Sequence, residues 1–389
     1  MGFAAYRTVL GIQQARFILA LGLLIRIPMW AGAIVLTLHV VAGLDQSYSA
    51  AGLLTMASTI AVAISAPWRG RLLDRRGLRA TLAPQLLVLA LVWAVAPFVD
   101  YWLLLPLAVV GGLFLVPTFS IVRQVLITAV EDRHRTAALS LDSLATELSF
   151  MIGPVLGVLG ATYVDTTWAL LFFEMAVVAG GALVWLVNPR LINEADETGE
   201  QLGWRGWVSP MVFAVLGAAV ACTVVLYGTD IGIVAALREM GHQSSIGWVL
   251  AVWGLGSALG AVVYGALRTT VPVFVLLALL AGTTVPVVLA EDRFTLAVLL
   301  FVCGMFCAPT ITATIDSLSR VVPPQVRGEV MGWHGSALTL GGAIGAPLAG
   351  FAIDESGWEA AFLVTALAAL AVALMGMFLL AGRARRVAT

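Results

Sequence analysis

The chain has 389 residues, of which 61% are hydrophobic and only 11% are charged. A soluble globular domain is about 25% charged. Because the shortage of charge runs the full length of the chain, a soluble enzyme with a single anchor is excluded. The net charge of −1 and the lack of a basic face argue against a nucleic-acid-binding protein.

The three cysteines do not indicate a redox or metal site. Cys222, Cys303 and Cys307 all lie in apolar runs, and no CxxC pattern or disulfide framework is present. Cys303 and Cys307 share one helical face, where free cysteine usually acts as a small packing residue. We therefore expect no metal and no cofactor.

Apolar stretches long enough to cross a bilayer follow one another along the whole chain. A membrane helix needs about 20 apolar residues, and breaks at charged or turn-rich segments leave twelve candidates. They span roughly 15–41, 49–67, 80–98, 101–127, 136–163, 167–188, 207–238, 244–267, 271–290, 294–319, 329–353 and 358–381. The first is long, carries Arg26 and lacks a small-residue cleavage site, which argues against a cleavable signal peptide.

The arginines predict how the spans are oriented. With the amino terminus in the cytoplasm, every arginine except Arg26, Arg238 and Arg293 falls on the cytoplasmic side. Such asymmetry is typical of the cytoplasmic loops of membrane proteins. We therefore expect a multi-pass protein of the plasma (inner) membrane with both termini in the cytoplasm, which requires an even number of spans.

The two halves of the chain resemble each other at an offset of about 192–195 residues. Pro117 with its neighbours in the fourth span corresponds to Pro309 in the tenth, and Gly70 corresponds to Gly265. The sequence thus predicts an all-α membrane protein with six-helix units at 1–189 and 207–389, joined by a polar cytoplasmic linker at 190–206. Parallel six-helix repeats build transporters whose site lies at the midplane between the halves.

The sharpest motif runs from Gly70 to Arg79, with the sequence Gly-Arg-Leu-Leu-Asp-Arg-Arg-Gly-Leu-Arg. It resembles the signature of the major facilitator superfamily between spans 2 and 3, which reads Gly-x-Leu-x-Asp-Arg-x-Gly followed by basic residues. Leu78 departs from the pattern at a position that is usually basic. A positive loop alone would explain the arginines, but not Asp74 between Gly70 and Gly77 at this spacing.

The resemblance implies a twelve-helix transporter in which this loop acts as a latch on the cytoplasmic side. Gly70 would allow close helix contact, and Asp74 would face the N-terminus of span 11, where the helix dipole favours a negative charge. The latch would be completed by ion pairs from Arg75 or Arg79 to acids of the loop between spans 4 and 5, namely Glu131 and Asp132. The second copy of the motif keeps only Gly265 and Arg268.

A second motif lies in the fifth span, where Gly153, Pro154 and Gly157 form Gly-Pro-x-x-Gly. It resembles the signature of antiporter branches of the same superfamily, although Ser149 and Val158 stand where glycine is usual. Glycine and proline bend a helix and let it pack closely on its neighbours. A generic kinked membrane helix remains the alternative interpretation.

Ionisable residues inside the spans are costly and are candidates for function. Arg26 in span 1 and Glu147 in span 5 lie near the middle of their spans, and we expect them to meet. They would form either a proton-exchanging pair or a permanent structural ion pair. Asp230, between glycines in span 7, is a second candidate for proton or cation coupling, with an interfacial helix-end aspartate as the alternative.

Other polar residues near the cytoplasmic ends are expected to form a gate. Arg123, Asp142 and Asp316 are assigned to one gate network, and Glu329 is placed as an acid in the first turn of span 11. We interpret His334 as a packed histidine rather than a proton relay. Glu174 is expected to reach the membrane interface. Aromatic residues near the expected cavity would suit a moderately hydrophobic substrate, namely Trp30, Phe114, Trp253 and Trp333.

These features predict a monomeric, non-enzymatic secondary transporter that couples protons to the efflux of a small amphipathic or anionic molecule. Its partners would be that substrate, protons and the lipid bilayer. Many proton-coupled drug exporters of the superfamily carry an acid in span 1, and Arg26 stands in that span here. The alternative is therefore uptake or uniport of an anionic solute or lipid-like metabolite. A membrane sensor without transport is a remote possibility.

Overall fold

The computed structural model describes residues 2–191, 206–242, 245–267 and 270–387, and these residues form helices joined by short turns. Arg268 and nearly all of the predicted linker at 190–206 lie outside the described residues. The long helices of the first half are α2 (Gln13–Leu38), α3 (Tyr48–Val95), α4 (Tyr101–Phe114), α5 (Thr118–Ala129), α6 (Arg135–Tyr163) and α7 (Thr166–Val187). Those of the second half are α8 (Pro210–Glu239), α9 (Ile246–Ala266), α10 (Val273–Thr284), α11 (Arg293–Gly304), α12 (Cys307–Val321), α13 (Arg327–Ser356) and α14 (Trp358–Val387).

Twelve membrane crossings result from these helices. Ten continuous helical segments are long and apolar enough to cross a bilayer, and Val273–Leu289 is a shorter apolar helix. The segment Ala50–Phe98 is 49 residues long and supplies two crossings, because α3 reverses at Gly77, whose φ of 74° is readily adopted only by glycine. The prediction of an all-α, twelve-span membrane protein is therefore confirmed.

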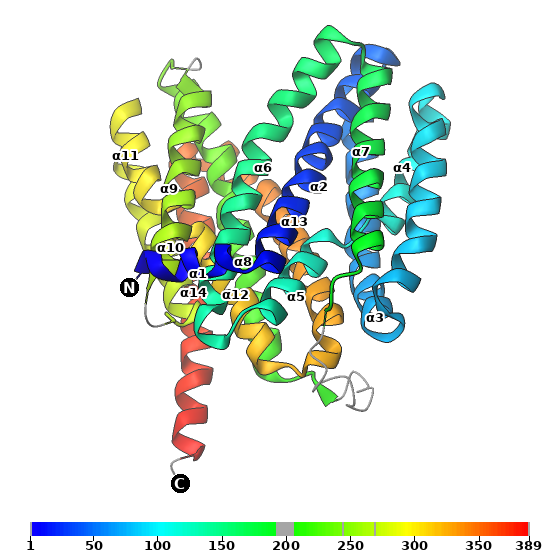
Figure 1. Ribbon diagram of the computed structural model, residues 1–389. Helices are drawn as coiled ribbons and strands as arrows, with labels where there is room; N and C mark the ends of the chain where they lie inside the picture. The colour runs from blue at the N-terminus through cyan, green and yellow to red at the C-terminus, as the bar shows by residue number, and fades with distance from the viewer. Residues whose placement is uncertain (1, 192–205, 243–244, 268–269, 388–389) are drawn as a thin grey trace.

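Each half of the chain has its own hydrophobic core. One core is built from residues between Tyr6 and Val184, and the other is built almost entirely from residues between Trp207 and Ala373. The halves meet mainly where α3 packs on α13 and where α6 packs on α9. In Figure 1 they form two bundles that diverge toward the top of the view. Two cores joined along a few helices suit movement of one bundle against the other.

The fourth and tenth crossings are interrupted at corresponding places. The fourth breaks between α4 and α5 at Leu115–Pro117, and the tenth breaks between α11 and α12 at Met305 and Phe306. Pro117 is the N-cap of α5, and Pro309 lies in the first turn of α12. Because proline has no backbone N–H to donate to the carbonyl one turn earlier, it favours such a break in a helix. The breaks in the two crossings therefore lie at positions that correspond in the sequences of the two halves.

A short helix, α1 (Gly2–Gly11), precedes the first crossing and was not predicted. In Figure 1 it lies crosswise below the middle of the view and reaches from α2 toward α9. Tyr6 and Val9 are its buried side chains, at the i,i+3 spacing of one helical face. The Tyr6 hydroxyl donates to the backbone carbonyls of Ala261 and Val262 in α9, at 3.2 and 2.7 Å. Burial raises the pKa of this phenol to about 12.

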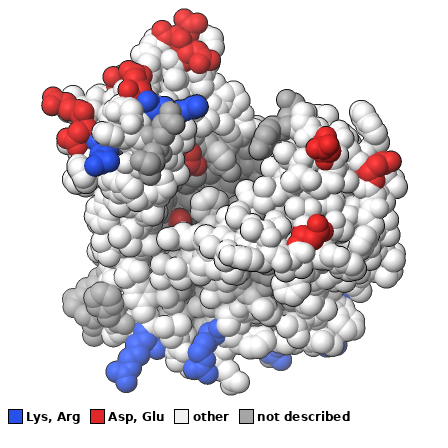
Figure 2. All heavy atoms as spheres, turned by 90° about the horizontal axis from the view of Figure 1, so that it is seen from above, with Lys and Arg blue, Asp and Glu red and all other residues white. Residues whose placement is uncertain are grey.

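The two ends of the bundles differ in how closely the halves approach. The carboxyl terminus and the reversal within α3 lie at the bottom of Figure 1, and the amino terminus lies in its lower half. The bundles touch on this side, and we call it the closed face. Seen from the opposite side, the open face, the molecule has a hollow between the bundles with acidic side chains visible inside it (Figure 2). The structure is therefore open on one side of the membrane region and closed on the other.

Candidate functional site

Asp74 joins the two bundles at the closed face. Its carboxylate accepts hydrogen bonds from the backbone N–H groups of Gly328 and Glu329, at 2.9 and 2.7 Å. These groups lie in the first turn of α13, where N–H groups lack helical partners and the helix dipole favours an anion. The placement of Asp74 at the start of span 11 is the one expected from the motif.

Gly70 and Arg71 complete this contact. A Cβ atom on Gly70 would overlap the backbone carbonyl of Gly328, so only glycine lets α3 and α13 approach this closely. Arg71 forms an ion pair with Glu329 in the first turn of α13. Further along the same two helices, Ser336 donates to the carbonyl of Ala63 at 2.5 Å. These contacts between α3 and α13 form one side of the interface between the two bundles, which we call the seam.

The predicted ion pairs between this turn and the next loop are wrong. Glu131 pairs with Arg133 at 2.7 Å, and Asp132 pairs with Arg135. Each acid is thus neutralised by an arginine two or three residues away, at little cost in chain entropy.

The arginines of the turn are therefore not bound to those acids. Arg79 donates instead to the last carbonyls of α7, on Trp185 and Leu186, at 3.2 and 3.0 Å. Its guanidinium also lies 5.5 Å from the Trp185 ring centroid. Arg75 is exposed and forms no ion pair with the part of the chain that the structure describes.

Arg26 does not meet Glu147, and this prediction is also wrong. Arg26 is fully buried and pairs with Asp142 of α6 at 2.7 Å. Its other contacts are the Thr146 hydroxyl at 3.1 Å and the face of Phe119, 4.5 Å from the ring centroid. The charge of Arg26 is therefore compensated within the amino-terminal bundle and is not offered to a solute.

Asp142 lies between two arginines. Its other carboxylate oxygen is 3.3 Å from Arg123 of α5, so the predicted association of Arg123 with Asp142 is found. The predicted membership of Asp316 is not found, because Asp316 pairs with Arg320 one turn further along α12, at 3.0 Å. The network is thus Arg26–Asp142–Arg123, which we call the charge cluster.

The charge cluster reaches the other bundle through His334. This histidine of α13 has its Nδ1 atom 3.5 Å from Arg123 and its Nε2 atom 2.8 Å from the Thr314 hydroxyl of α12. A second polar contact between the bundles joins Ser143 of α6 to Thr312 of α12, at 2.7 Å. Neither contact could be predicted from the sequence, because each depends on how helices from different bundles face one another.

Glu147 and Asp230 lie apart from the charge cluster. Glu147 is half-buried on α6 and accepts a hydrogen bond from Ser257 of α9 at 3.0 Å. Asp230 is half-buried on α8 and lies close enough to Glu147 for their charges to interact. The structure therefore places two acids from opposite bundles within electrostatic range of each other, and neither forms an ion pair with a base among the described residues.

The Gly-Pro-x-x-Gly motif serves close packing of α6 on α2. A Cβ atom on Gly153 would crowd Trp30 and the carbonyl of Ile27, and one on Gly157 would crowd the backbone of Ala31. Helix α6 nevertheless continues through Pro154 without interruption. Glu174 of α7 also packs on α2, where Gly32 leaves room for its carboxylate.

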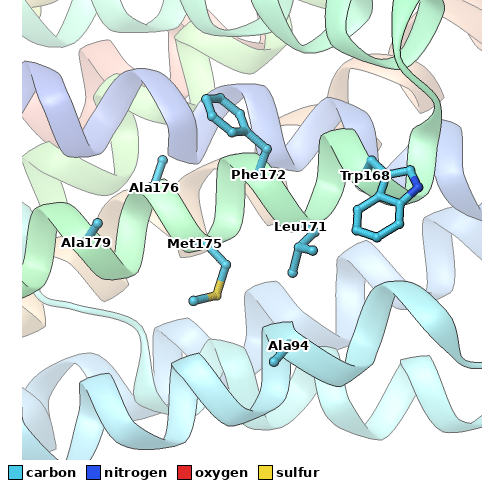
Figure 3. Close-up of a pocket in the computed structure, with 7 residues that line it drawn as sticks. All are labelled: Ala94, Trp168, Leu171, Phe172, Met175, Ala176 and Ala179. Carbon is cyan, nitrogen blue, oxygen red and sulfur yellow. The ribbon is translucent and has the colours of Figure 1, made fainter.

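A separate apolar pocket of 670 Å³ lies between α3 and α7 of the amino-terminal bundle (Figure 3). It is lined by apolar and aromatic side chains that include Trp168, Phe172 and Met175. Because none of the acids or the arginines of the charge cluster lines it, we do not assign the transport site to this pocket.

The matched family agrees with this architecture. The profile of the Major Facilitator Superfamily matches residues 18–237 and 211–388. The chain belongs to this superfamily. Members of the superfamily are secondary transporters, and the helices and the motif at Gly70–Arg79 are features of an integral, multi-pass transporter of this class.

Two curated members of the superfamily are similar in sequence. The chain is 28% identical over 339 residues to the multidrug resistance protein MdtG of Dickeya zeae (strain Ech586), with 78% of each chain covered. It is 22% identical over 184 residues to an ascochitine biosynthesis cluster MFS transporter of Didymella fabae, with 45% of this chain and 34% of the relative covered.

Solved structures share the fold at lower identity. The fucose:proton symporter FucP of E. coli has a TM-score of 0.72 at 15% identity, covering 94% of this chain and 99% of that chain. A bacterial homologue of the iron transporter ferroportin in the outward-facing state has a TM-score of 0.74 at 12% identity, covering 94% and 98%. At such identities the likeness establishes the fold and not the substrate.

Proposed function

We propose that the chain is a proton-coupled exporter of amphipathic cations that works by alternating access. The observation that carries the proposal is the pair Glu147 and Asp230, two half-buried acids from opposite bundles whose charges act on each other. The similarity to a multidrug resistance protein supports efflux of an amphipathic compound.

The acids supply the coupling through competition between protons and substrate. On the open face, taken as extracellular, they take up protons and lose their attraction for a cation, so the cation leaves outward. On the cytoplasmic side they release the protons and bind the next cation. The membrane potential contributes ~2.3 kcal/mol per charge for each 100 mV, and ~1.4 kcal/mol corresponds to a tenfold gradient. Exchange of one proton for one monovalent cation moves no net charge, so the membrane potential drives export only when both acids carry protons. Two protons entering per cation carry one net charge, which supports a gradient of a few tens-fold for each 100 mV.

The structure supports an anionic substrate less well than the sequence does. Arg26 was the residue expected to favour an anion, but its guanidinium is fully buried and paired with Asp142. Glu147 and Asp230 are half-buried acids without an ion-pair partner among the described residues. A negative lining favours a cation by simple electrostatics. Uptake or uniport of an anion therefore has no specific observation in its favour.

The arginine distribution supports placing the closed face in the cytoplasm. With this orientation the termini and the turn at Gly70–Arg79 are cytoplasmic, and the hollow opens outward. The chain would act as a monomer in the plasma (inner) membrane, because each chain contains both bundles and the seam between them.

Transport into proteoliposomes tests the proposal. Purified protein is reconstituted, a pH gradient is imposed, and the movement of a lipophilic cationic dye is compared with that of an anionic dye of similar size. We expect the gradient to drive the cation only. Glu147→Gln and Asp230→Asn should each abolish gradient-driven accumulation, and Glu174→Gln, which removes a membrane acid outside the pair, should retain it. Unchanged gradient dependence in both acid variants would refute the proton role.

A further inference from the structure

His334 links the bundles in the closed half of the molecule. It is completely buried on α13 and touches the amino-terminal bundle through Arg123, while its other ring nitrogen bonds to Thr314 within its own bundle. Because Arg123 in turn binds Asp142, the histidine fixes the end of the charge cluster that faces the seam.

The hydrogen bonds assign the protonation state of the imidazole. The Arg123 guanidinium has only donors, so Nδ1 must accept and cannot carry a proton. The Thr314 hydroxyl donates to the carbonyl of Ile311 at 2.6 Å, so its oxygen accepts a hydrogen from Nε2 at 2.8 Å. His334 is therefore the neutral, Nε2-protonated tautomer in this conformation. An imidazolium here would point a second positive charge at the guanidinium.

The surroundings offer no charge that would reverse this preference. Arg123 from α5 is the charged side chain that acts on His334 among the described residues. Asp142 of α6 lies beyond Arg123, and both of its oxygens are engaged by Arg26 and Arg123. The α12 side presents the uncharged Thr314. No acid of the described chain is thus bonded to the ring to compensate a proton.

We propose that His334 is a positioning residue of the cytoplasmic gate, and that a proton on its imidazole opens the gate by breaking the contact with Arg123. The inference rests on the alternating access of the proposed function, because opening the closed face moves α13 away from α5. Once freed from Arg123, the ring can take up a proton in the pH range that is usual for histidine. Acidic pH therefore favours the inward-facing state, and neutral pH favours the closed face seen here.

The expected magnitude follows from linkage. Only the inward-facing state takes up the proton, so protonation raises the ratio of inward- to outward-facing molecules. The ratio rises by a factor of one plus the protonated-to-neutral ratio of His334 in the inward-facing state. For a histidine with the unperturbed pKa of about 6.5, that factor rises about tenfold between pH 7.5 and pH 5.5. A residue that only filled space would produce no such shift.

Distances between spin labels measure the shift without requiring transport. One label pair uses Arg76→Cys and Val321→Cys, exposed positions on the closed-face ends of the two bundles. The other uses Tyr163→Cys and Leu289→Cys, exposed positions at the open face. The native cysteines are all buried and should label poorly. Populations of the two states are read from both pairs at pH 7.5 and pH 5.5 in lipid nanodiscs.

The measurement is made in a Glu147→Gln/Asp230→Asn background, which removes the pH response of the acid pair. We expect the tenfold shift to persist there, to vanish with His334→Gln, and to remain with His39→Gln. His39 is a buried histidine that bonds to Thr166 within the amino-terminal bundle, at 3.1 Å. Gln keeps an acceptor and a donor but does not titrate near neutral pH.

Two results would overturn the inference. One is that the populations of the two states do not change with pH in the Glu147→Gln/Asp230→Asn protein that retains His334. The other is an undiminished shift in the His334→Gln variant. Failure of the proposed function gives a different pattern, namely loss of proton-driven dye movement in every assay while the pH-dependent distance change survives.

Discussion

Replacing Asp142 by Asn should destabilise the protein strongly, because two buried guanidinium groups lose their common counter-charge. Asp142 is 1% exposed and Arg26 is 0% exposed, so water cannot replace the carboxylate. Arg123 is 7% exposed and is bound by the same carboxylate. Breaking a buried ion pair by removing one partner costs about 3–5 kcal/mol. We expect a loss in that range for Asp142→Asn.

Asp316→Asn provides the matched control. Asp316 is as deeply buried, at 6% side-chain exposure, but its partner Arg320 is 39% exposed and can turn to water. The expected loss is about 1 kcal/mol or less, as for partly exposed ion pairs. The free energy of unfolding is measured by equilibrium titration with SDS in mixed micelles. Equal losses for the two variants, or a loss below 1 kcal/mol for Asp142→Asn, would refute the argument from burial.

Three further predictions concern closure of the seam, measured with the same label pairs. Gly70→Ala forces a Cβ atom into α13, and overpacking costs about 1–3 kcal/mol. The ratio of outward- to inward-facing molecules should therefore fall about 5- to 150-fold, while Gly254→Ala, at an open position on α9, should leave it unchanged. Asp74→Asn removes the charge and one of two bonds to the α13 N-terminus and should cost the closed face about 1–2 kcal/mol; no change at low salt would contradict it. Tyr6→Phe removes the hydroxyl bonds from α1 to α9, at a cost of about 1 kcal/mol, and an unaltered state distribution would show that α1 does not secure the seam.

The sequence predicted the contact made by a family motif, but it did not predict which residues distant in the chain form ion pairs. The Gly70–Arg79 pattern correctly indicated where Asp74 lies, because a family motif encodes a contact between helices that are distant in the chain. The partner of Arg26 was not predictable in this way. Asp142 and Glu147 are five residues apart, which turns their side chains about 140° from each other on α6. Depth in the membrane therefore could not decide which of them faces α2.

Local competition explains the other errors. Glu131, Asp132 and Asp316 each pair with an arginine two to four residues away, and close neighbours outcompete distant partners because little chain entropy is lost. The helix α1 was overlooked because its ten residues are too short for a span. The spacing of Tyr6 and Val9 along one helical face was a usable signal.

The class of the protein, the twelve crossings and the superfamily motif could be predicted from the amino-acid sequence alone. These follow from the length of apolar runs, the positions of charges between them and the spacing of a few glycines, all of which act along the chain. Only the tertiary structure decided that Arg26 belongs to Asp142, that Glu147 approaches Asp230, and that His334 reaches across the seam to Arg123. Those contacts depend on the rotation of each helix about its axis and on how two bundles meet, which apolar composition does not specify because a span can rotate without changing its sequence.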